Sequence, residues 1–291
     1  MAQKVFSTPY DINEEPVLRK KLEQQGFKFS AINYAFWQAK KSAISVTFYK
    51  SGKLLIQGWG ADEFAQKIIS VGEKIDKLEH IDNLQSWIGT DESGKGDFFG
   101  SLVAAAIYLK KDRLKELMLL GVQDSKNLSD KKIFEVAQKI KANFDYAAII
   151  IKPEQYNRLY KQYKNLNKLL AVTHAQAIEK ILRKVDCNVV LCDKFGDETL
   201  IANALLKKGR QVTLIQQTKA ESNPAVAAAS IVARAEFLNN LAQLSRKFQI
   251  DFPKGASDKV IMAGKLFVEK YSIDQLNIVA KQHFKTVKKI V

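Results

Sequence analysis

From about residue 87 onward the chain alternates short apolar runs with longer segments of helical spacing, and this alternation restricts the fold more than any other feature. Ser129 is placed to cap a helix over 131–141, and Asn223 with Pro224 predicts a second helix through about residue 239. Residues 167–183 also have helical spacing. The apolar runs have the length of strands and lie at residues 87–90, 102–109, 146–151, 188–191 and 212–216. Strands that alternate with helices predict a mixed α/β layer fold.

The first 80 residues follow a different pattern, which predicts a separate small α+β domain. A helix is expected near residues 17–25, ending at Gly26, and another over 61–71. Between them, residues 33–41 and 44–49 alternate as strands do, and a turn at 50–53 leads to a third strand. We therefore expect an antiparallel sheet with helices on one face, a boundary near residues 75–85, and domains spanning 1–80 and 85–291.

The charge of the chain favours a polyanionic partner. Lys and Arg total 46 against 31 Asp and Glu, which gives a net charge of +15, and the pI is about 9.5. No apolar run approaches the roughly 20 residues of a membrane span. The first residues lead into no signal-peptide core, and two cysteines are too few for a disulfide scaffold. We expect a soluble cytoplasmic protein that does not contact membranes.

Four carboxylates stand at the ends of predicted elements. Asp91 and Glu92 end an apolar strand and precede Gly94 and Gly96, which make a bend and close approach to a ligand easy. Asp193 ends a later strand, where a turn residue is the more common interpretation. Glu221 precedes a helix, where an acid also favours the helix dipole.

Gathered in one place, these acids would suit a hard divalent cation. Mg²⁺ prefers oxygen ligands, and two such ions can support phosphodiester cleavage. A zinc site is disfavoured because there is no CxxC pair and no HExxH motif, and the chain has only three histidines. A phosphate-loop signature and the GxSxG elbow of serine hydrolases are also absent.

Several segments resemble type 2 ribonucleases H, specifically ribonuclease HIII. They occur in the family's order and span about residues 88–257: Asp91–Gly100, Asp124–Asp130, Asn165–His174, Lys219–Ile231 and Phe252–Ser257. Glu221 stands where ribonuclease HIII has Glu and the sister ribonuclease HII has Asp. The early segments Tyr34–Lys40 and Tyr49–Lys53 are similar to the N-terminal domain of ribonuclease HIII, which resembles the TATA-box-binding-protein fold and which ribonuclease HII lacks.

The resemblance implies a ribonuclease H-like catalytic domain. Asp91, Glu92, Asp193 and Glu221 would be the catalytic residues and would hold Mg²⁺ or Mn²⁺, with two ions when substrate is bound. The reaction would be endonucleolytic cleavage of the RNA strand of an RNA–DNA hybrid, giving 5′-phosphate and 3′-hydroxyl ends. His174 is more readily interpreted as a packed histidine than as a catalytic one. We expect a monomer with no obligate protein partner.

Further residues are candidates for substrate contact. The loop Ser93, Gly94, Lys95 and Gly96 would meet the 2′-hydroxyl groups near the scissile phosphate, because that hydroxyl distinguishes RNA from DNA. The remaining candidates follow from their positions beside the acids or in the N-terminal domain: Lys126, Lys219, Tyr34, Lys40, Tyr49, Lys50 and Lys53. For the N-terminal residues an ordinary solvated sheet face is an equal alternative.

Two other functions explain part of the same pattern. A module that binds hybrids or structured RNA without cutting would account for the positive charge, since phosphate contacts depend on charge. It would not account for four acids at the ends of strands and helices. An enzyme acting on single ribonucleotides embedded in duplex DNA, the task of ribonuclease HII, would use the same acids.

Overall fold

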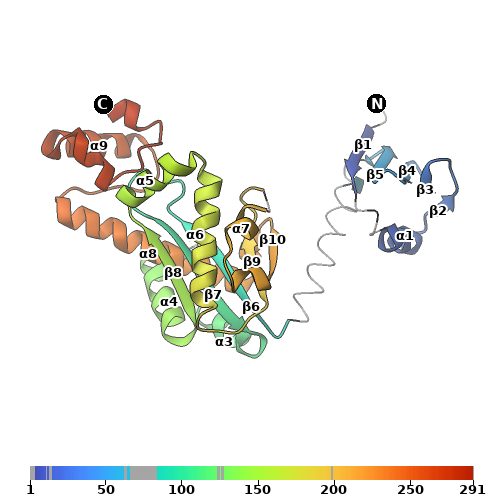
Figure 1. Ribbon diagram of the computed structural model, residues 1–291, viewed down its shortest axis with the longest axis horizontal. Coiled ribbons are helices and arrows are strands. Elements are labelled where there is room, and N and C mark those ends of the chain that lie inside the picture. Colours follow the sequence, from blue (N-terminus) through green and yellow to red (C-terminus); the bar gives the residue numbers. More distant parts are fainter. Residues whose placement is uncertain are drawn as a thin grey trace. The chain divides into compact units, whose positions relative to one another are not determined.

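The computed structural model describes residues 4–10, 12, 15–61, 64–65, 84–122, 125, 128–197 and 199–290. The chain divides into two compact units, Met1–Asn83 and Leu84–Val291 (Figure 1). Most of the helix expected over 61–71 and most of the expected boundary region lie outside the described residues.

The first unit is a five-stranded antiparallel sheet with a helix on its buried face. Its strand order is β1-β5-β4-β3-β2. The alternation predicted for residues 33–49 is confirmed, because Trp37, Val46 and Phe48 are buried with Leu18 and Leu22 of the helix. The elements are β1 (Lys4–Pro9), α1 (Glu15–Gln24), β2 (Lys28–Ser30), β3 (Ala35–Lys41), β4 (Ile44–Tyr49) and β5 (Lys53–Gly58).

The second unit is a mixed five-stranded sheet with the order β10-β9-β6-β7-β8. Strands β9 and β10 run parallel to β6, β7 pairs antiparallel with β6, and β8 pairs antiparallel with β7. The mixed α/β fold expected from the alternating pattern is thereby confirmed. Its strands are β6 (Ser86–Ser93), β7 (Leu102–Lys110), β8 (Tyr146–Ile151), β9 (Val189–Asp193) and β10 (Thr213–Gln217).

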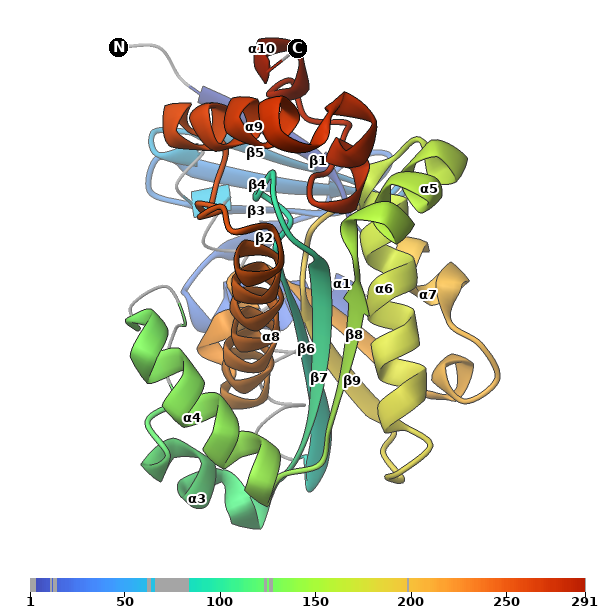
Figure 2. The same ribbon diagram turned by 90° about the vertical axis from the view of Figure 1, so that its left-hand side faces the viewer.

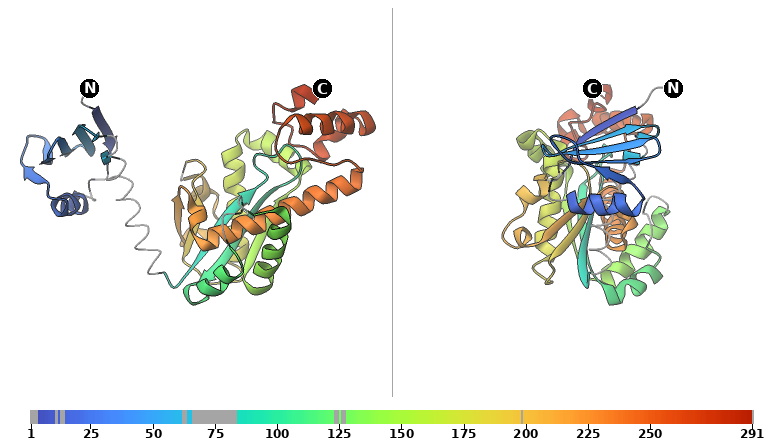
Figure 3. Two further views of the ribbon diagram at one scale, coloured as in Figure 1. Left: turned by 180° about the vertical axis from the view of Figure 1, so that it is seen from behind. Right: turned by 90° about the vertical axis from the view of Figure 1, so that its right-hand side faces the viewer.

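Helices cover both faces of this sheet. Figure 2 shows α4 and α8 on one side of the strands and α6 on the other. Seen from behind, α8 lies across the strands (Figure 3). The α-helices are α3 (Leu114–Leu119), α4 (Asp130–Asn143), α5 (Pro153–Tyr163), α6 (Leu166–Ile181), α7 (Thr199–Ala204), α8 (Pro224–Phe248), α9 (Asp258–Tyr271) and α10 (Val287–Ile290). Short 3₁₀ helices are η2 (Lys111–Arg113), η4 (Gly209–Gln211), η5 (Ala220–Ser222) and η6 (Ile273–Ile278).

Helix α8 is held very close to the central strand. A Cβ atom added to Gly89 of β6 would lie only 2.3 Å from the carbonyl carbon of Ala225 and from the amide nitrogen of Val226. The run of small residues from Ala227 to Ala229 is buried, as expected for tight packing on a sheet. The caps at Ser129 and Asn223 are as predicted, but α8 continues to Phe248, beyond the predicted end at residue 239.

None of the helices that the structure describes is both long enough and apolar enough to cross a membrane.

Candidate active site

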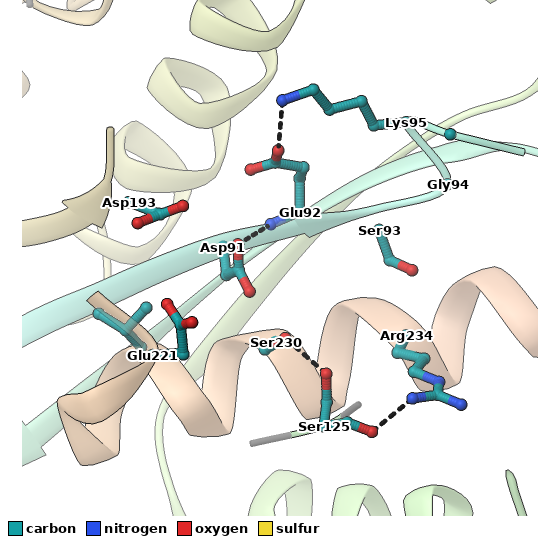
Figure 4. A pocket seen from close by; sticks show the side chains of 12 residues that line it. Asp91, Glu92, Ser93, Gly94, Lys95, Ser125, Asp193, Glu221, Ser230 and Arg234 are labelled. Atoms are coloured by element: carbon teal, nitrogen blue, oxygen red, sulfur yellow. Dashed lines mark hydrogen bonds and ion pairs between the residues drawn. The ribbon is translucent and has the colours of Figure 1, made fainter. Parts of the chain in front are cut away.

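One pocket in the second unit brings together all four carboxylates that the sequence singled out. Asp91 and Glu92 come from β6, Asp193 ends β9, and Glu221 lies in η5, just before α8 (Figure 4). The pocket thus lies where β9 ends beside β6 and where η5 leads into α8. The full lining is Asp91, Glu92, Ser93, Gly94, Lys95, Gly96, Ser125, Asp193, Glu221, Val226, Ser230 and Arg234.

Strand β6 presents its two acids to opposite sides of the sheet. It stays paired with β7 through Ser93, so the strand does not end at Asp91. Glu92 contacts His174 of α6, whereas Asp91 contacts Ser230 of α8 on the opposite face. Both side chains still line the pocket, because the pairing of β6 with β9 stops at Thr90, directly before the two acids. The two acids therefore reach one pocket although the strand continues past them.

Asp91 is held in an environment that resists ionisation. Burial, together with the nearby charge of Glu92, raises the pKa of Asp91 to about 7, against a hydrogen bond from Ser230. The backbone amide of Glu92 also donates to Asp91 Oδ1 at 2.8 Å. Ser230 Oγ in turn lies 2.8 Å from Ser125 Oγ. A buried carboxyl group with another acid beside it gains most from a bound cation.

Glu92 is oriented by a buried chain of hydrogen bonds. Thr90 Oγ1 donates to the carbonyl oxygen of Ala105 at 2.8 Å, so the Nδ1–H of His174 donates to Thr90 Oγ1 at 3.0 Å. The ring is thereby fixed with Nε2 toward Glu92 Oε2, 2.9 Å away. Burial raises the pKa of Glu92, but the hydrogen bond and charge of His174 together with Lys95 outweigh it, and the net pKa lies below the usual value.

The other two acids are placed by the segment that leads into α8. Asp193 Oδ1 accepts a hydrogen bond from the backbone amide of Ala220 at 3.2 Å, which ties the end of β9 to η5. Asn223 Oδ1 caps α8 by accepting from the amide of Ala225 and also accepts from Trp87 Nε1, both at 3.0 Å. The position of Glu221 relative to β6 therefore depends on a cap that β6 itself supports.

The predicted substrate-binding residues of the second unit divide into three groups. Ser93 to Gly96 line the pocket, and Lys95 Nζ lies 3.5 Å from Glu92 Oε1. Lys219 is exposed and does not line it. Lys126 lies outside the described residues.

Sequence reasoning overlooked three polar residues of the pocket. Ser230 and Arg234 follow Val226 at intervals of four, so they share one face of α8, and this spacing is visible in the sequence. Ser125 reaches the site by tertiary packing, which leaves no local signal.

In the first unit the candidate residues lie at the ends of β3, β4 and β5. Tyr34, directly before β3, is 85% exposed, and Lys40, Lys50 and Lys53 are also exposed. Tyr49 is half-buried. Tyr34 has a φ of 63°, a left-handed conformation that is uncommon for an aromatic residue.

The four acids surround the pocket without forming a compact ligand set. Among the described residues, no three His, Cys, Asp or Glu side chains stand close enough together to hold a metal ion as they are. Separation is what electrostatics predicts for carboxylates without a countercharge, because like charges repel. The chemistry of the donors still suits a hard cation, since every acidic ligand would be an oxygen.

Comparison with known proteins agrees with this picture. The family model for ribonuclease HII matches residues 88–287, and a domain of unknown function, DUF3378, matches residues 14–74. Ribonuclease HIII of Protochlamydia amoebophila is 41% identical, covering 98% of this chain and 96% of its own. The Mn²⁺ complex of Bst-RNase HIII is similar in structure, with a TM-score of 0.68, 29% identity, and coverage of 99% of this chain and 98% of that one.

A third comparison covers only part of this chain. Ribonuclease H2 from Pyrococcus horikoshii has a similar fold, with 23% identity and a TM-score of 0.60. The match covers 96% of that chain but only 70% of this one. The curated relative and Bst-RNase HIII instead match nearly the whole length. The resemblance drawn from the sequence motifs is confirmed: the chain belongs to the ribonuclease HIII family and is a ribonuclease H.

Proposed function

We propose that this ribonuclease H cuts the RNA strand of RNA–DNA hybrids internally, leaving 5′-phosphate and 3′-hydroxyl ends. The observation that carries the proposal is the meeting of four carboxylates from three separate segments in one pocket, beside a glycine loop. Such a site combines ligands for cations with a backbone that a nucleic-acid strand can approach. A binding module would have no need of this concentration of acids.

Asp91, Glu92, Asp193 and Glu221 would hold Mg²⁺ or Mn²⁺ ions, two with substrate bound. The oxygen-only donor set fits such ions, and the similar Bst-RNase HIII has been solved with Mn²⁺. When bound, paired divalent ions activate water and stabilise the leaving oxygen in phosphodiester hydrolysis. His174 would act beside this set by fixing the orientation of Glu92 through its 2.9 Å contact.

The loop Ser93 to Gly96 would recognise the RNA strand. Gly96 is exposed and has no neighbouring atoms that a side chain would touch, so the backbone is open at this point of the loop, whereas Gly94, with a φ of +87°, is packed against the carbonyl oxygen of Ser101. Backbone amide and carbonyl groups can then meet the 2′-hydroxyl groups that DNA lacks. Lys95, together with Lys126 and Lys219, would contact phosphates.

The first unit would grip the hybrid outside the pocket. Its support is the exposed aromatic ring of Tyr34, with Tyr49, Lys50 and Lys53 at the same end of the sheet, and the exposed cation Lys40 near the other end of β3. We propose that the enzyme works as a monomer, since a single chain supplies all four carboxylates. The cytoplasm fits its two cysteines, which are too few for a disulfide framework.

An end-labelled hybrid, incubated with the full chain and Mg²⁺ or Mn²⁺, tests the proposal. Internal cuts in the RNA strand are expected, with 5′-phosphate ends by mass spectrometry and no reaction in EDTA. Asp91→Asn should abolish cleavage while leaving hybrid binding largely intact. Asp112→Asn, which alters an exposed acid on η2, should change neither cleavage nor binding. Metal-independent turnover would falsify the metal assignment. A duplex with one embedded ribonucleotide distinguishes the ribonuclease HII task.

A further inference from the structure

The loop that leaves the pocket is enclosed on its far side by the C-terminal part of the chain. Phe98 donates its backbone amide to the carbonyl oxygen of Gly255 at 2.9 Å, and Gly100 donates to that of Val279 at 3.0 Å. Phe99 pairs with Ala280 in an isolated antiparallel bridge. Residues 97–100 therefore have fixed partners that lie about 160–180 positions away in sequence.

A buried lysine lies at the centre of this contact. Lys281 has no exposed surface, and its Nζ donates to the carbonyl oxygens of Asp97 at 2.8 Å and Gly100 at 2.7 Å. The carbonyl oxygen of Phe99 is a third, longer acceptor at 3.4 Å. An ammonium group has three N–H donors and no acceptor, so these three carbonyls account for its full hydrogen-bonding capacity.

Burying the ammonium group of Lys281 costs free energy, which its hydrogen bonds have to offset. Burial lowers the pKa of Lys281 to about 7, and the charge of Asp97 partly opposes that shift. Removing an ammonium group from water costs several kcal/mol, and an apolar side chain in the same volume would often be as stable or more so. What an apolar side chain cannot do is hold three carbonyl oxygens toward one point. The ammonium group of Lys281 thus holds the three carbonyl oxygens as a bound cation would.

The residues held by Lys281 are connected to the pocket by direct contact. The loop closes on itself, because a Cβ atom added to Gly94 would lie 2.1 Å from the carbonyl oxygen of Ser101. The amide of Asp97 also reaches the carbonyl oxygen of Gly94 at 3.4 Å. A shift of residues 97–100 therefore has to move the backbone of Gly94 to Gly96, which lines the pocket.

We propose that Lys281 is a positioning residue for the pocket loop, and that its ammonium group sets where Gly94, Lys95 and Gly96 meet the RNA strand. This inference rests on the proposed function, in which that loop recognises the 2′-hydroxyl groups. Lys281 itself touches neither the four carboxylates nor the pocket. Its effect should consequently appear in the preference for hybrid over DNA duplex more than in overall affinity for nucleic acid.

The test uses Lys281→Met in the full chain, which keeps the length of the side chain and removes the donors. Ile181→Ala is the matched control, since it removes a fully buried side chain from the core between α6 and the sheet. Three quantities are measured for each protein: the melting temperature, hydrogen exchange of the amides of residues 94–100, and the ratio of Kd values for a DNA duplex and a hybrid of the same sequence in EDTA.

Lys281→Met should accelerate exchange in the loop and lower the preference for hybrid by about tenfold, which corresponds to the net contribution of one hydrogen bond. Ile181→Ala should lower the melting temperature and leave both other quantities unchanged. Lys281→Arg, which keeps the charge but replaces a compact group by a planar fork, should change both in the same direction to a smaller extent.

Unchanged exchange or an unchanged preference in either Lys281 variant overturns the inference, and so does an equal loss of preference in the control. If Lys281→Met does not fold, Lys281→Arg decides by the same criteria. Failure of the proposed function has a different signature, because the unaltered chain would then show no preference for hybrid.

Discussion

Gly89→Ala is expected to separate the two halves of the active site. Gly89 lies two residues before Asp91, where α8 crosses β6, and an added Cβ would stand 2.3 Å from two backbone atoms of the helix. Carbon atoms in contact normally lie about 3.5–4.0 Å apart, so strand and helix must move apart by about 1.2–1.7 Å. Backbone atoms cannot rotate out of the way as a flexible side chain can.

The size of the effect follows from that displacement. Overpacking of a well-packed contact costs about 1–3 kcal/mol, and in a unit of this size each kcal/mol lowers the melting temperature by about 2–4 °C. Glu221 and Ser230 move with α8, whereas Asp91 and Glu92 stay with β6. A displacement of about 1 Å among reacting groups can cost about 100-fold in rate, so cleavage should fall by about this factor.

The assay compares kcat/KM on a labelled hybrid with the melting temperature. Gly96→Ala is the matched control for protein stability, because an added Cβ there meets no atom within 4 Å. It should leave the melting temperature unchanged, and any loss of activity would report the loop's contact with substrate. A Gly89→Ala protein with the stability and kcat/KM of the unaltered chain would refute the argument from close packing.

Three further predictions concern the pocket and the first unit. In EDTA, Asp91→Asn should melt at a higher temperature than the unaltered chain above pH 7. The pKa of Asp91 is about 7 in the folded state and about 4 in the unfolded state, so the folded state loses stability as the pH rises from about 4 to 7 and Asp91 ionises. The higher melting temperature of Asp91→Asn should therefore disappear as the pH falls toward about 4. His174→Ala should raise the pKa of Glu92, because His174 lowers it; an unchanged titration of the Glu92 carboxyl group, followed by NMR in EDTA, would contradict the hydrogen-bond chain. Tyr34→Asn, chosen because Asn tolerates a positive φ, should weaken hybrid binding by about 5- to 100-fold, the range for loss of one stacked base, with kcat unchanged at saturation; an unchanged Kd at fixed salt argues against a gripping role.

Local signals in the sequence predicted the elements that carry the site. The lengths of the apolar runs gave β6 to β10, and the caps at Ser129 and Asn223 gave the starts of α4 and α8. The four acids could be chosen because each stands at the end of such an element. Their meeting follows from strand order, with β9 next to β6.

Features that depend on tertiary packing left no such signal. Helix α8 continues past Asn239 because Leu241 and Phe248 are buried on its far half, which overrides the weak helix propensity of Asn. Strands β1 and β2 exist through pairing with β5 and β3. Neither the hydrogen bond from His174 to Glu92 nor the three carbonyls around Lys281 follows from spacing along the chain.

The hydrogen bond between Trp87 and Asn223 gives the second unit a natural optical reporter. Trp87 is the single tryptophan of residues 84–291, while Trp37 and Trp59 belong to the first unit. Replacing those two by Phe would leave one indole, whose emission depends on the contact that holds the start of α8 against the central strand. The intrinsic fluorescence of that protein would follow the assembly of the catalytic end of the sheet separately from the melting of the first unit.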